Sequence, residues 1–218
     1  MLGAENLPEE GPVVIVSNHV GALGPIAVGA SLPMEMHFWI HADMLDPLLA
    51  PDYLRCDFVE PQLHIPPPFS RWLAGAITKI HIPLLRAVGG IPVYHDPDGF
   101  GKTFHLTVGL LAQGKCILIF PEDPALPTDP RYNMTPFQKG FTRLAELYYE
   151  RTRQILPFHP LAVHAETRTV RVGKPIRYNP FNHPASERQR IKSMLELSIH
   201  QMLFQASEDG YLSLPLPN

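Results

Sequence analysis

Cysteines and long hydrophobic runs are scarce in this chain, and each scarcity excludes a class of protein. Only two of the 218 residues are cysteines, Cys56 and Cys116, which are too few for a disulfide framework or a zinc site. No apolar run reaches the roughly 18 residues that a membrane-spanning helix needs. Residues 1–11 lack the basic and apolar segments of a signal peptide. We therefore expect a cytoplasmic protein with free thiols, in which Cys116 is buried and unreactive.

Charged residues are also few, at 18% of the chain, and the formal net charge is −3. A chain without a basic excess does not attract nucleic acid through its overall charge, so we expect no nucleic-acid partner. Hydrophobic residues make up 45%, which is enough for a sizeable core and argues against disorder. Prolines are frequent, 25 in all, but they are dispersed along the chain. The length fits a single domain covering residues 1–218.

Short apolar runs rich in β-branched residues alternate with segments of helical periodicity. We predict buried strands at 12–17, 36–41, 91–94, 115–120, 155–163 and 169–172. We predict helices over 100–111, ended by Gly114, over 141–148, and over about 186–206, where Ser186 and Gln189 resemble a capping box. This alternation predicts an α/β fold with a largely parallel or mixed central sheet flanked by helices.

Polar residues follow three of the predicted strands. Ligands bind beyond the carboxyl ends of the strands in such sheets, so the segments 17–19, 94–95 and 121–123 form one candidate site. His19 precedes a glycine-rich turn, and its near-neutral pKa suits a general base, although a turn histidine bonded to backbone fits the same pattern. Glu122 projects from the end of a strand, where a solvated turn residue is the alternative. We expect His19 and Glu122 to lie on one cleft.

Two further features bear on ligands. Phe137-Gln138-Lys139-Gly140 leads into a predicted helix whose N-terminus could attract an anion. The chain has 11 histidines, and His37 and His41 lie in one predicted strand. In a strand, their separation is about 13 Å, which is too far to share one ion. We expect no metal site.

Taken in order, these blocks resemble the motifs of the glycerophosphate/lysophosphatidate acyltransferase family, also described as 1-acylglycerol-3-phosphate acyltransferase-like. Asn18-His19 resembles the first motif, Gly89–His95 the second, and Phe120-Pro121-Glu122 the third, with Phe137–Gly140 as its sequel. Ile155-Leu156-Pro157 resembles the fourth motif, and 172–176 resembles the closing strand. The likeness covers roughly residues 12–178, most of the chain.

The resemblance implies an enzyme of phospholipid biosynthesis. The family's histidine, here His19, deprotonates a hydroxyl acceptor such as a lysolipid, which then attacks the thioester of acyl-CoA or acyl-carrier protein. Asn18, Glu122, His95 and Lys139 stand at positions expected to bind substrate. No cofactor or metal is implied, because the acyl donor is a co-substrate. The partners implied are the acyl donor and membrane lipids.

The sequence departs from the family pattern at several motif positions. Gly24 stands where the family has the Asp that orients the histidine, and His95 and Ala125 stand in regions where it has arginines. Asp123 replaces the glycine of the third motif. Asp43, Asp46 and Asp123 are alternative acids for His19. Two missing arginines favour an acceptor without the usual phosphomonoester, since arginine offers a fixed fork for phosphate.

A segment between the first two motifs combines aromatic and basic residues. Phe69, Trp72, Leu73, Ile77 and Ile80 lie near one face of a predicted helix, among Arg71, Lys79 and Arg86. This pattern suits a peripheral membrane surface, and an ordinary core-facing helix fits it equally well.

Two classes of function therefore stand side by side. The first is an acyltransferase at the cytoplasmic face of a membrane, with His19 as the base. The alternative is a catalytically impaired homologue that binds lipid or membrane. A serine hydrolase is disfavoured, because the chain has no Gly-x-Ser-x-Gly elbow.

Overall fold

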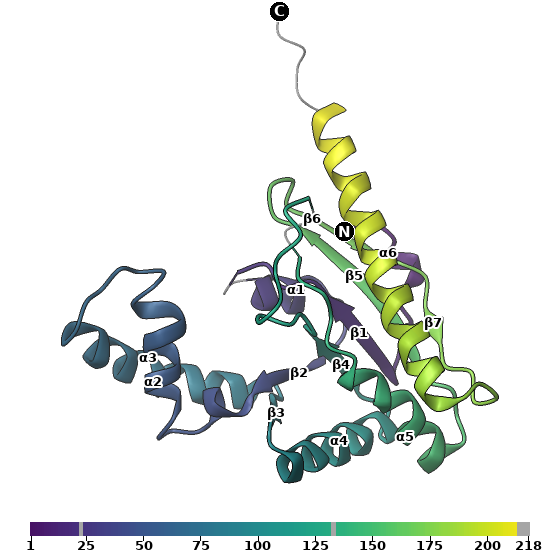
Figure 1. The fold of residues 1–218 in the computed structure, drawn as a ribbon, viewed down its shortest axis with the longest axis horizontal. Helices are drawn as coiled ribbons and strands as arrows, with labels where there is room; N and C mark the ends of the chain where they lie inside the picture. The colour runs from purple at the N-terminus through teal and green to yellow at the C-terminus, as the bar shows by residue number, and fades with distance from the viewer. Residues whose placement is uncertain (22–23, 132–133, 213–218) are drawn as a thin grey trace, which may run out of the picture. The chain divides into compact units, whose positions relative to one another are not determined.

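The computed structural model describes residues 1–21, 24–131 and 134–212 as a mixed α/β protein (Figure 1). The predicted fold class is confirmed, since the strands are mostly parallel and helices flank them. We expected one domain over 1–218, whereas the chain packs as two compact units. The first unit combines Met1–Glu35 with Val108–Asn218, and the second is Met36–Thr107.

Five strands form the sheet of the first unit. β1 (Val13–Ser17) pairs in parallel with β4 (Cys116–Ile119) on one side and with β5 (Pro157–His164) on the other. β6 (Thr169–Val172) and β7 (Ile176–Arg177) both pair with β5 in antiparallel fashion. Every residue of β1 and β4 is buried, which is why both read as unbroken apolar runs in the sequence. Two of these four pairings are parallel and two are antiparallel, so the sheet of this unit is mixed, which the prediction of a largely parallel or mixed sheet includes.

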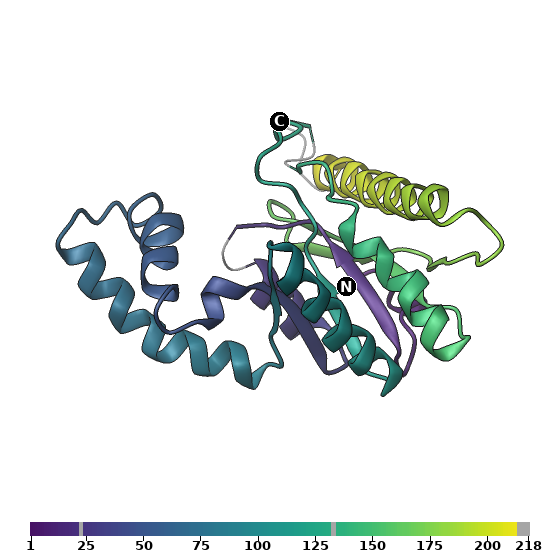
Figure 2. The same ribbon diagram turned by 60° about the horizontal axis from the view of Figure 1, so that its bottom comes forward.

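Helices complete the first unit. α6 (Pro184–Leu212) packs against β5, and the two lie side by side in Figures 1 and 2. Ile191 and Leu195 of this helix are fully buried. The remaining helices of this unit are η1 (Ala4–Asn6), α1 (Gly24–Ser31), η4 (Gly140–Thr142) and α5 (Arg143–Thr152).

The predicted stop at Gly114 is confirmed. α4 (Pro97–Ala112) begins in the second unit and ends in the first, just before this glycine. Gly114 has a positive φ of 78°, which costs glycine little because it has no Cβ. The backbone N–H groups of Gly114 and Lys115 donate to the carbonyls of Leu111 and Leu110, both at 3.0 Å. These bonds satisfy the last carbonyls of the helix.

The predicted capping box at Ser186 is wrong. α6 already begins at Pro184, and the Gln189 side chain donates to the Ser193 hydroxyl rather than to the backbone at the helix start. The acidic residue that organises this end is Glu187, whose side chain is fully buried.

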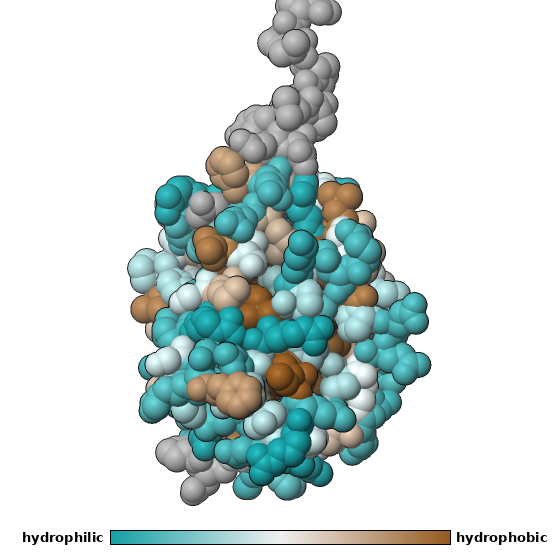
Figure 3. All heavy atoms as spheres, turned by 90° about the vertical axis from the view of Figure 1, so that its right-hand side faces the viewer, coloured by the Kyte–Doolittle hydropathy of each residue, from teal (hydrophilic) through white to brown (hydrophobic). Residues whose placement is uncertain are grey.

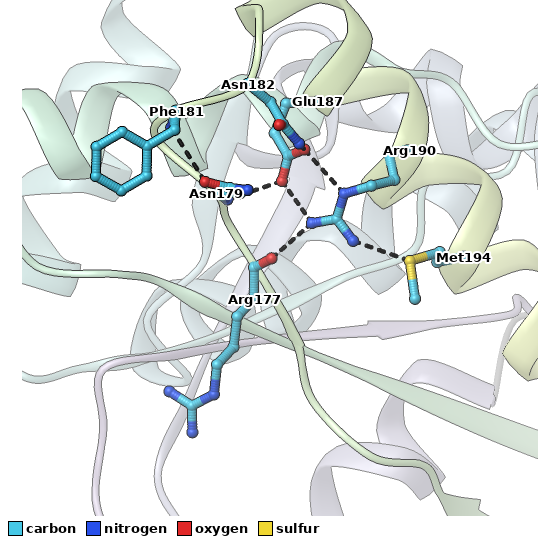
Figure 4. A network of polar contacts seen from close by, with 7 residues as sticks. All are labelled: Arg177, Asn179, Phe181, Asn182, Glu187, Arg190 and Met194. Atoms are coloured by element: carbon cyan, nitrogen blue, oxygen red, sulfur yellow. Dashed lines mark hydrogen bonds and ion pairs between the residues drawn. The ribbon is translucent and has the colours of Figure 1, made fainter.

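Glu187 stands at the centre of a network of polar contacts (Figure 4). Its carboxylate accepts hydrogen bonds from the Asn179 backbone N–H at 2.8 Å, from the Asn182 amide at 2.7 Å, and from the Arg190 guanidinium. Arg190 also donates to the Arg177 carbonyl at 2.7 Å. Burial alone would raise the pKa of Glu187, but these donors lower it to about 2. The network joins the start of α6 to the segment that follows β7.

The second unit contains two strands and a group of helices. β2 (Met36–His41) and β3 (Ile91–Val93) pair in parallel. The helices are η2 (Ala42–Leu45), α2 (Ala50–Leu54), η3 (Arg55–Val59) and α3 (Phe69–Ala87). A small apolar core of Leu54, Val59 and Ala74 joins α2, η3 and α3.

The two cysteines lie as predicted. Cys116 is buried in β4, and this burial raises the pKa of its thiol, so the thiol stays protonated and unreactive. Cys56 is exposed, and both thiols are free. Within the described part of the chain, no helix is both long and apolar enough to cross a membrane.

Candidate functional site

His19 and Glu122 are brought together by the pairing of β1 with β4. The two strands are parallel neighbours, so their carboxyl ends reach the same edge of the sheet. His19 follows β1 and Glu122 follows β4, 103 positions apart in the chain. The backbone N–H of His19 donates to Oε1 of Glu122 at 2.5 Å. We expected the two residues to lie on one cleft, and the structure places them in contact at one edge of the sheet. That they share a cleft stays a prediction.

The second carboxylate oxygen of Glu122 binds a different segment. Oε2 accepts from the backbone N–H of Thr135 at 2.7 Å and from its hydroxyl at 3.1 Å. The backbone on either side is tied to the same segment, since Asp123 N–H donates to the Pro136 carbonyl and Gln138 N–H to the Pro121 carbonyl. Glu122 therefore fixes the His19 turn to the loop around Thr135.

The His19 imidazole is positioned to work in its neutral form. The residue is exposed, but its ring packs edge-on against Phe120, with the ring centroids 5.5 Å apart. Partial burial lowers the pKa of His19, and the negative charge of Glu122 opposes that shift. The imidazole is thus mostly unprotonated at neutral pH and can accept a proton.

Asp43, Asp46 and Asp123 are the candidates for an acid that orients His19. Oδ1 of Asp123 accepts the Ala125 N–H, which closes its own turn. Asp43 and Asp46 belong to the second unit, where Asp43 lies 3.8 Å from Nδ1 of His41. Among the described residues, no carboxylate is hydrogen-bonded to the His19 ring. Glu122 acts on the imidazole through its charge alone.

Asn18 has a structural role. Its side chain is buried, and its amide both donates to the Val163 carbonyl at 3.0 Å and accepts from the Val163 N–H at 2.8 Å. The side chain thus extends the β1–β5 pairing past the end of β1 and fixes the direction in which His19 leaves the strand. We expected Asn18 to bind substrate, and the sequence gives no sign of Val163, 145 positions away.

His95 follows β3 in the second unit. Its ring packs against that of His41 at the end of β2, with centroids 4.7 Å apart, and His41 also packs against Tyr53 at 4.9 Å. Burial is the main cause that lowers the pKa of His41, and His95 contributes in the same direction. Burial and Asp57 raise the pKa of Tyr53 to about 12. The structure therefore gives His95 a partner that sequence analysis did not identify.

Lys139 is exposed and directly precedes η4. Its backbone carbonyl accepts a hydrogen bond from the hydroxyl of Thr142 at 2.7 Å. The anion-binding role expected at this helix start stays a prediction.

An open pocket of about 770 Å³ lies between the loop that follows β4 and α6. It adjoins Glu122, because Thr135, which binds Glu122, lies between two pocket residues, Met134 and Pro136. The charge of Glu122 also acts on His200 in the pocket wall. Neither His19 nor Glu122 lines the pocket itself. The other lining residues are Pro127, Thr128, Asp129, Pro130, Arg131, Lys192, Ser193, Glu196 and Leu197.

Sequence reasoning missed this pocket, because it joins an irregular loop to a helix far along the chain. The sequence predicts a helix over about 186–206 but does not show which of its residues face the loop. Across the described residues, no group of three or more His, Cys, Asp or Glu side chains is arranged to hold a metal ion.

Comparison with models of protein families and with curated proteins gives no match for this chain. What the site can do therefore follows from its own arrangement. A neutral, solvent-accessible imidazole stands beside a carboxylate at the edge of a parallel sheet, next to a pocket with both apolar and charged walls.

Proposed function

We propose that this chain is an acyltransferase that moves a fatty acyl group from acyl-CoA or acyl-carrier protein to a hydroxyl acceptor such as a lysolipid. The observation that carries the proposal is the contact between His19 and Glu122. His19 belongs to the segment that resembles the family's first motif, and Glu122 to the segment that resembles its third. Their meeting at one sheet edge is what a working site of this type requires.

In the proposed reaction, the neutral His19 imidazole takes the proton of the acceptor hydroxyl as general base. The acceptor oxygen attacks the thioester carbonyl, the carbon–oxygen bond forms and the carbon–sulfur bond breaks. The thiolate leaves and takes up the proton from the imidazolium, so the products are an ester and a free thiol. The step needs little acid assistance, because a thiolate is a good leaving group.

Glu122 supports this reaction as a positioning residue in two ways. Its hydrogen bond holds the backbone of His19, which fixes the position from which the imidazole side chain extends. Its negative charge favours the imidazolium that forms during proton transfer, which compensates in part for Gly24 at the position of the family's Asp. With both of its oxygens bonded to His19 and Thr135, Glu122 has less capacity to bind a substrate directly.

The pocket between the loop and α6 is the proposed binding surface for one of the substrates. Met134, Leu197 and prolines supply apolar walls, which suit an acyl chain. Arg131 and Lys192 are paired with Asp129 and Glu196, so the pocket does not present a dedicated phosphate clamp. This arrangement favours an acceptor without the usual phosphomonoester.

We further propose that the protein acts at the cytoplasmic face of a membrane, as a peripheral protein. The apolar acyl product and acceptor are found there, and the exposed aromatic side chains of α3 offer a means of attachment.

One observation favours the alternative function, a catalytically impaired lipid-binding homologue. No carboxylate of the described residues is bonded to the His19 ring, so the base lacks the partner that usually orients it. In a serine-protease triad, disabling the aspartate that orients the histidine lowers turnover by roughly ten-thousandfold.

Release of free thiol from acyl-CoA, measured across a panel of lysolipids, distinguishes the two functions. An acyltransferase releases thiol only when a suitable acceptor is present, and Gly24→Asp increases the rate if the imidazole lacks a carboxylate partner. Absence of turnover in both wild type and Gly24→Asp, together with binding of lysolipid, supports the alternative.

A further inference from the structure

Helix α3 has one face that packs within its own unit. Ser70, Ala74, Thr78 and Ile82 are buried and recur every four residues. Leu73 and Ile77 are partly buried and also pack against the small core formed with α2 and η3. In Figures 1 and 2, α2 and α3 lie side by side. On this face, α3 is the ordinary core-facing helix that was one of the two interpretations of its sequence.

The opposite face of α3 is apolar as well, but it is exposed. Phe69, Trp72 and Ile80 are 69%, 75% and 75% exposed, and Leu84 is 53% exposed. At about 100° of rotation per residue, these positions fall on one side of the helix, opposite the buried row. Ala76, Pro83 and Ala87 fall on the same side. This set, which we call the outer stripe, contains no charged or polar side chain.

Charges on α3 are of one sign only. The helix carries Arg71, Lys79 and Arg86 and no acidic residue, although the whole chain has a net charge of −3. By the same helical rotation, Lys79 and Arg86 border the outer stripe on one side. Arg86 is held in place by a hydrogen bond to the Leu45 carbonyl at 3.0 Å. An apolar stripe bordered by cations is complementary to an anionic lipid surface.

The exposed apolar residues on the face drawn in Figure 3 are scattered rather than grouped in such a stripe. Figure 3 shows a largely hydrophilic face of the molecule, on which single hydrophobic residues are scattered among polar ones. Phe181, for example, is 94% exposed and lies in the polar neighbourhood of Asn179 and Asn182 (Figure 4). Isolated residues of this kind are normal on protein surfaces, whereas a continuous stripe marks an interaction surface.

A second copy of the chain is a poorer occupant than a bilayer. If two α3 helices packed through their outer stripes, the cations at Lys79 and Arg86 would meet those of the partner helix with no acid from α3 between them. Anionic headgroups would pair with the same cations instead. Trp72 also suits the membrane interface, where its ring is partly apolar and its N–H reaches polar groups.

We propose that the outer stripe of α3 docks on an anionic phospholipid bilayer, with the helix lying in the plane of the surface. Phe69, Trp72, Ile80 and Leu84 enter the boundary between headgroups and acyl chains, and Lys79 and Arg86 bind headgroup phosphates. The helix does not span the bilayer. This inference rests on the proposed membrane association, but it is independent of acyl transfer by His19.

Trp72 provides a direct probe, because the chain has only one other tryptophan. Trp39 is half-buried, donates from Nε1 to the Thr107 hydroxyl at 2.9 Å and packs against Phe104. A Trp39→Phe protein therefore reports on Trp72 alone. We expect its fluorescence to shift to the blue and to be quenched by brominated acyl chains when phosphatidylglycerol-containing vesicles are added. We expect no comparable change with pure phosphatidylcholine vesicles.

The same vesicles test the surface by flotation of the full chain. Trp72→Ser/Ile80→Ser should lower the affinity for phosphatidylglycerol-containing vesicles by at least about tenfold, because it removes much of the apolar area that would be buried. Lys79→Gln should weaken the dependence of binding on salt. Phe181→Ser is the matched control, and it should leave binding unchanged. Circular dichroism of each variant confirms that the fold is retained.

Three results would overturn the proposal. Equal binding of wild type and Trp72→Ser/Ile80→Ser would show that another surface docks, and so would an unshifted Trp72 emission on vesicles that the protein binds. A wild-type dimer that Trp72→Ser/Ile80→Ser converts to monomer, without any vesicle binding, would assign the stripe to a second copy. Thiol release with a soluble, short-chain acceptor should be unchanged in this variant, so a failure of docking is distinct from a failure of catalysis.

Discussion

Glu122→Gln is the substitution that most sharply tests how the site is held together. The two carboxylate oxygens of Glu122 accept from donors on different segments, Oε1 from the His19 N–H and Oε2 from the N–H and hydroxyl of Thr135. A glutamine has the same shape but only one oxygen. Whichever way its amide is turned, its NH₂ group faces an N–H donor. At least one hydrogen bond to a charged acceptor is therefore lost.

Such a bond contributes about 1.5–3 kcal/mol. Glu122 is half-buried, so water can partly solvate the donor that loses its acceptor. We therefore expect the free energy of unfolding to fall by about 2 kcal/mol. With a urea dependence of about 2 kcal/mol per molar, the midpoint of unfolding falls by about 1 M. Amide hydrogen exchange at His19 and Thr135 should become faster in the variant.

Asp123→Asn is the matched control for this substitution. It removes a negative charge from the next residue, but Asp123 uses one oxygen to accept the Ala125 N–H at 3.1 Å, and asparagine keeps that oxygen. We expect its stability to stay within about 0.5 kcal/mol of wild type. A Glu122→Gln protein as stable as Asp123→Asn, with unchanged exchange at His19, would refute the role of Glu122 as a clamp.

Two predictions concern pH. Burial lowers the pKa of His19, and the base must be neutral to act. The rate of thiol release should therefore rise with pH, with a midpoint below pH 6.5. A midpoint above 6.5 would show that burial does not lower the pKa of His19. The pKa of Glu187 is about 2 in the folded chain and 4.5 when unperturbed, so its contribution to stability is complete above pH 4.5 and is lost as pH falls toward 2. The difference between these two pKa values corresponds to about 3 kcal/mol of unfolding free energy. Glu187→Gln should flatten the fall in unfolding free energy between these pH values, and an unaltered slope would argue against the network.

The parts of the fold that follow from local pattern were predictable. β1 and β4 are buried on both faces, so their sequences are continuous apolar runs of strand length. Parallel pairing of such strands places their carboxyl ends together, and this is sufficient to bring His19 to Glu122. The end of α4 was also predictable, since Gly114 is suited to a positive φ.

The parts that depend on tertiary contacts were not predictable. Ser186 and Gln189 have the spacing of a capping box, but buried Glu187 finds donors in Asn179 and Asn182 before the helix begins, and this network sets the start of α6. Asn18 likewise looks like a motif residue in the sequence, whereas its amide is bonded to Val163 in another strand.

Helix α3 shows why one pattern supported two interpretations. Apolar residues occur on both the buried and the exposed side of the helix, so periodicity alone does not separate a core face from a docking face. Burial separates them, because Leu73 and Ile77 pack on the small core while Trp72 and Ile80 stay exposed. The cations that favour a bilayer over a protein partner lie along one border of the outer stripe.

The central claim, that His19 is the base of an acyl transfer, is tested most directly by thiol release from wild type and from His19→Ala. The substitution keeps the backbone N–H that donates to Glu122, so the turn should retain its fold. With acyl-CoA and an acceptor that wild type uses, we predict a loss of at least about a hundredfold in the rate, as expected for removal of a general base. Equal rates in the two proteins would contradict the claim.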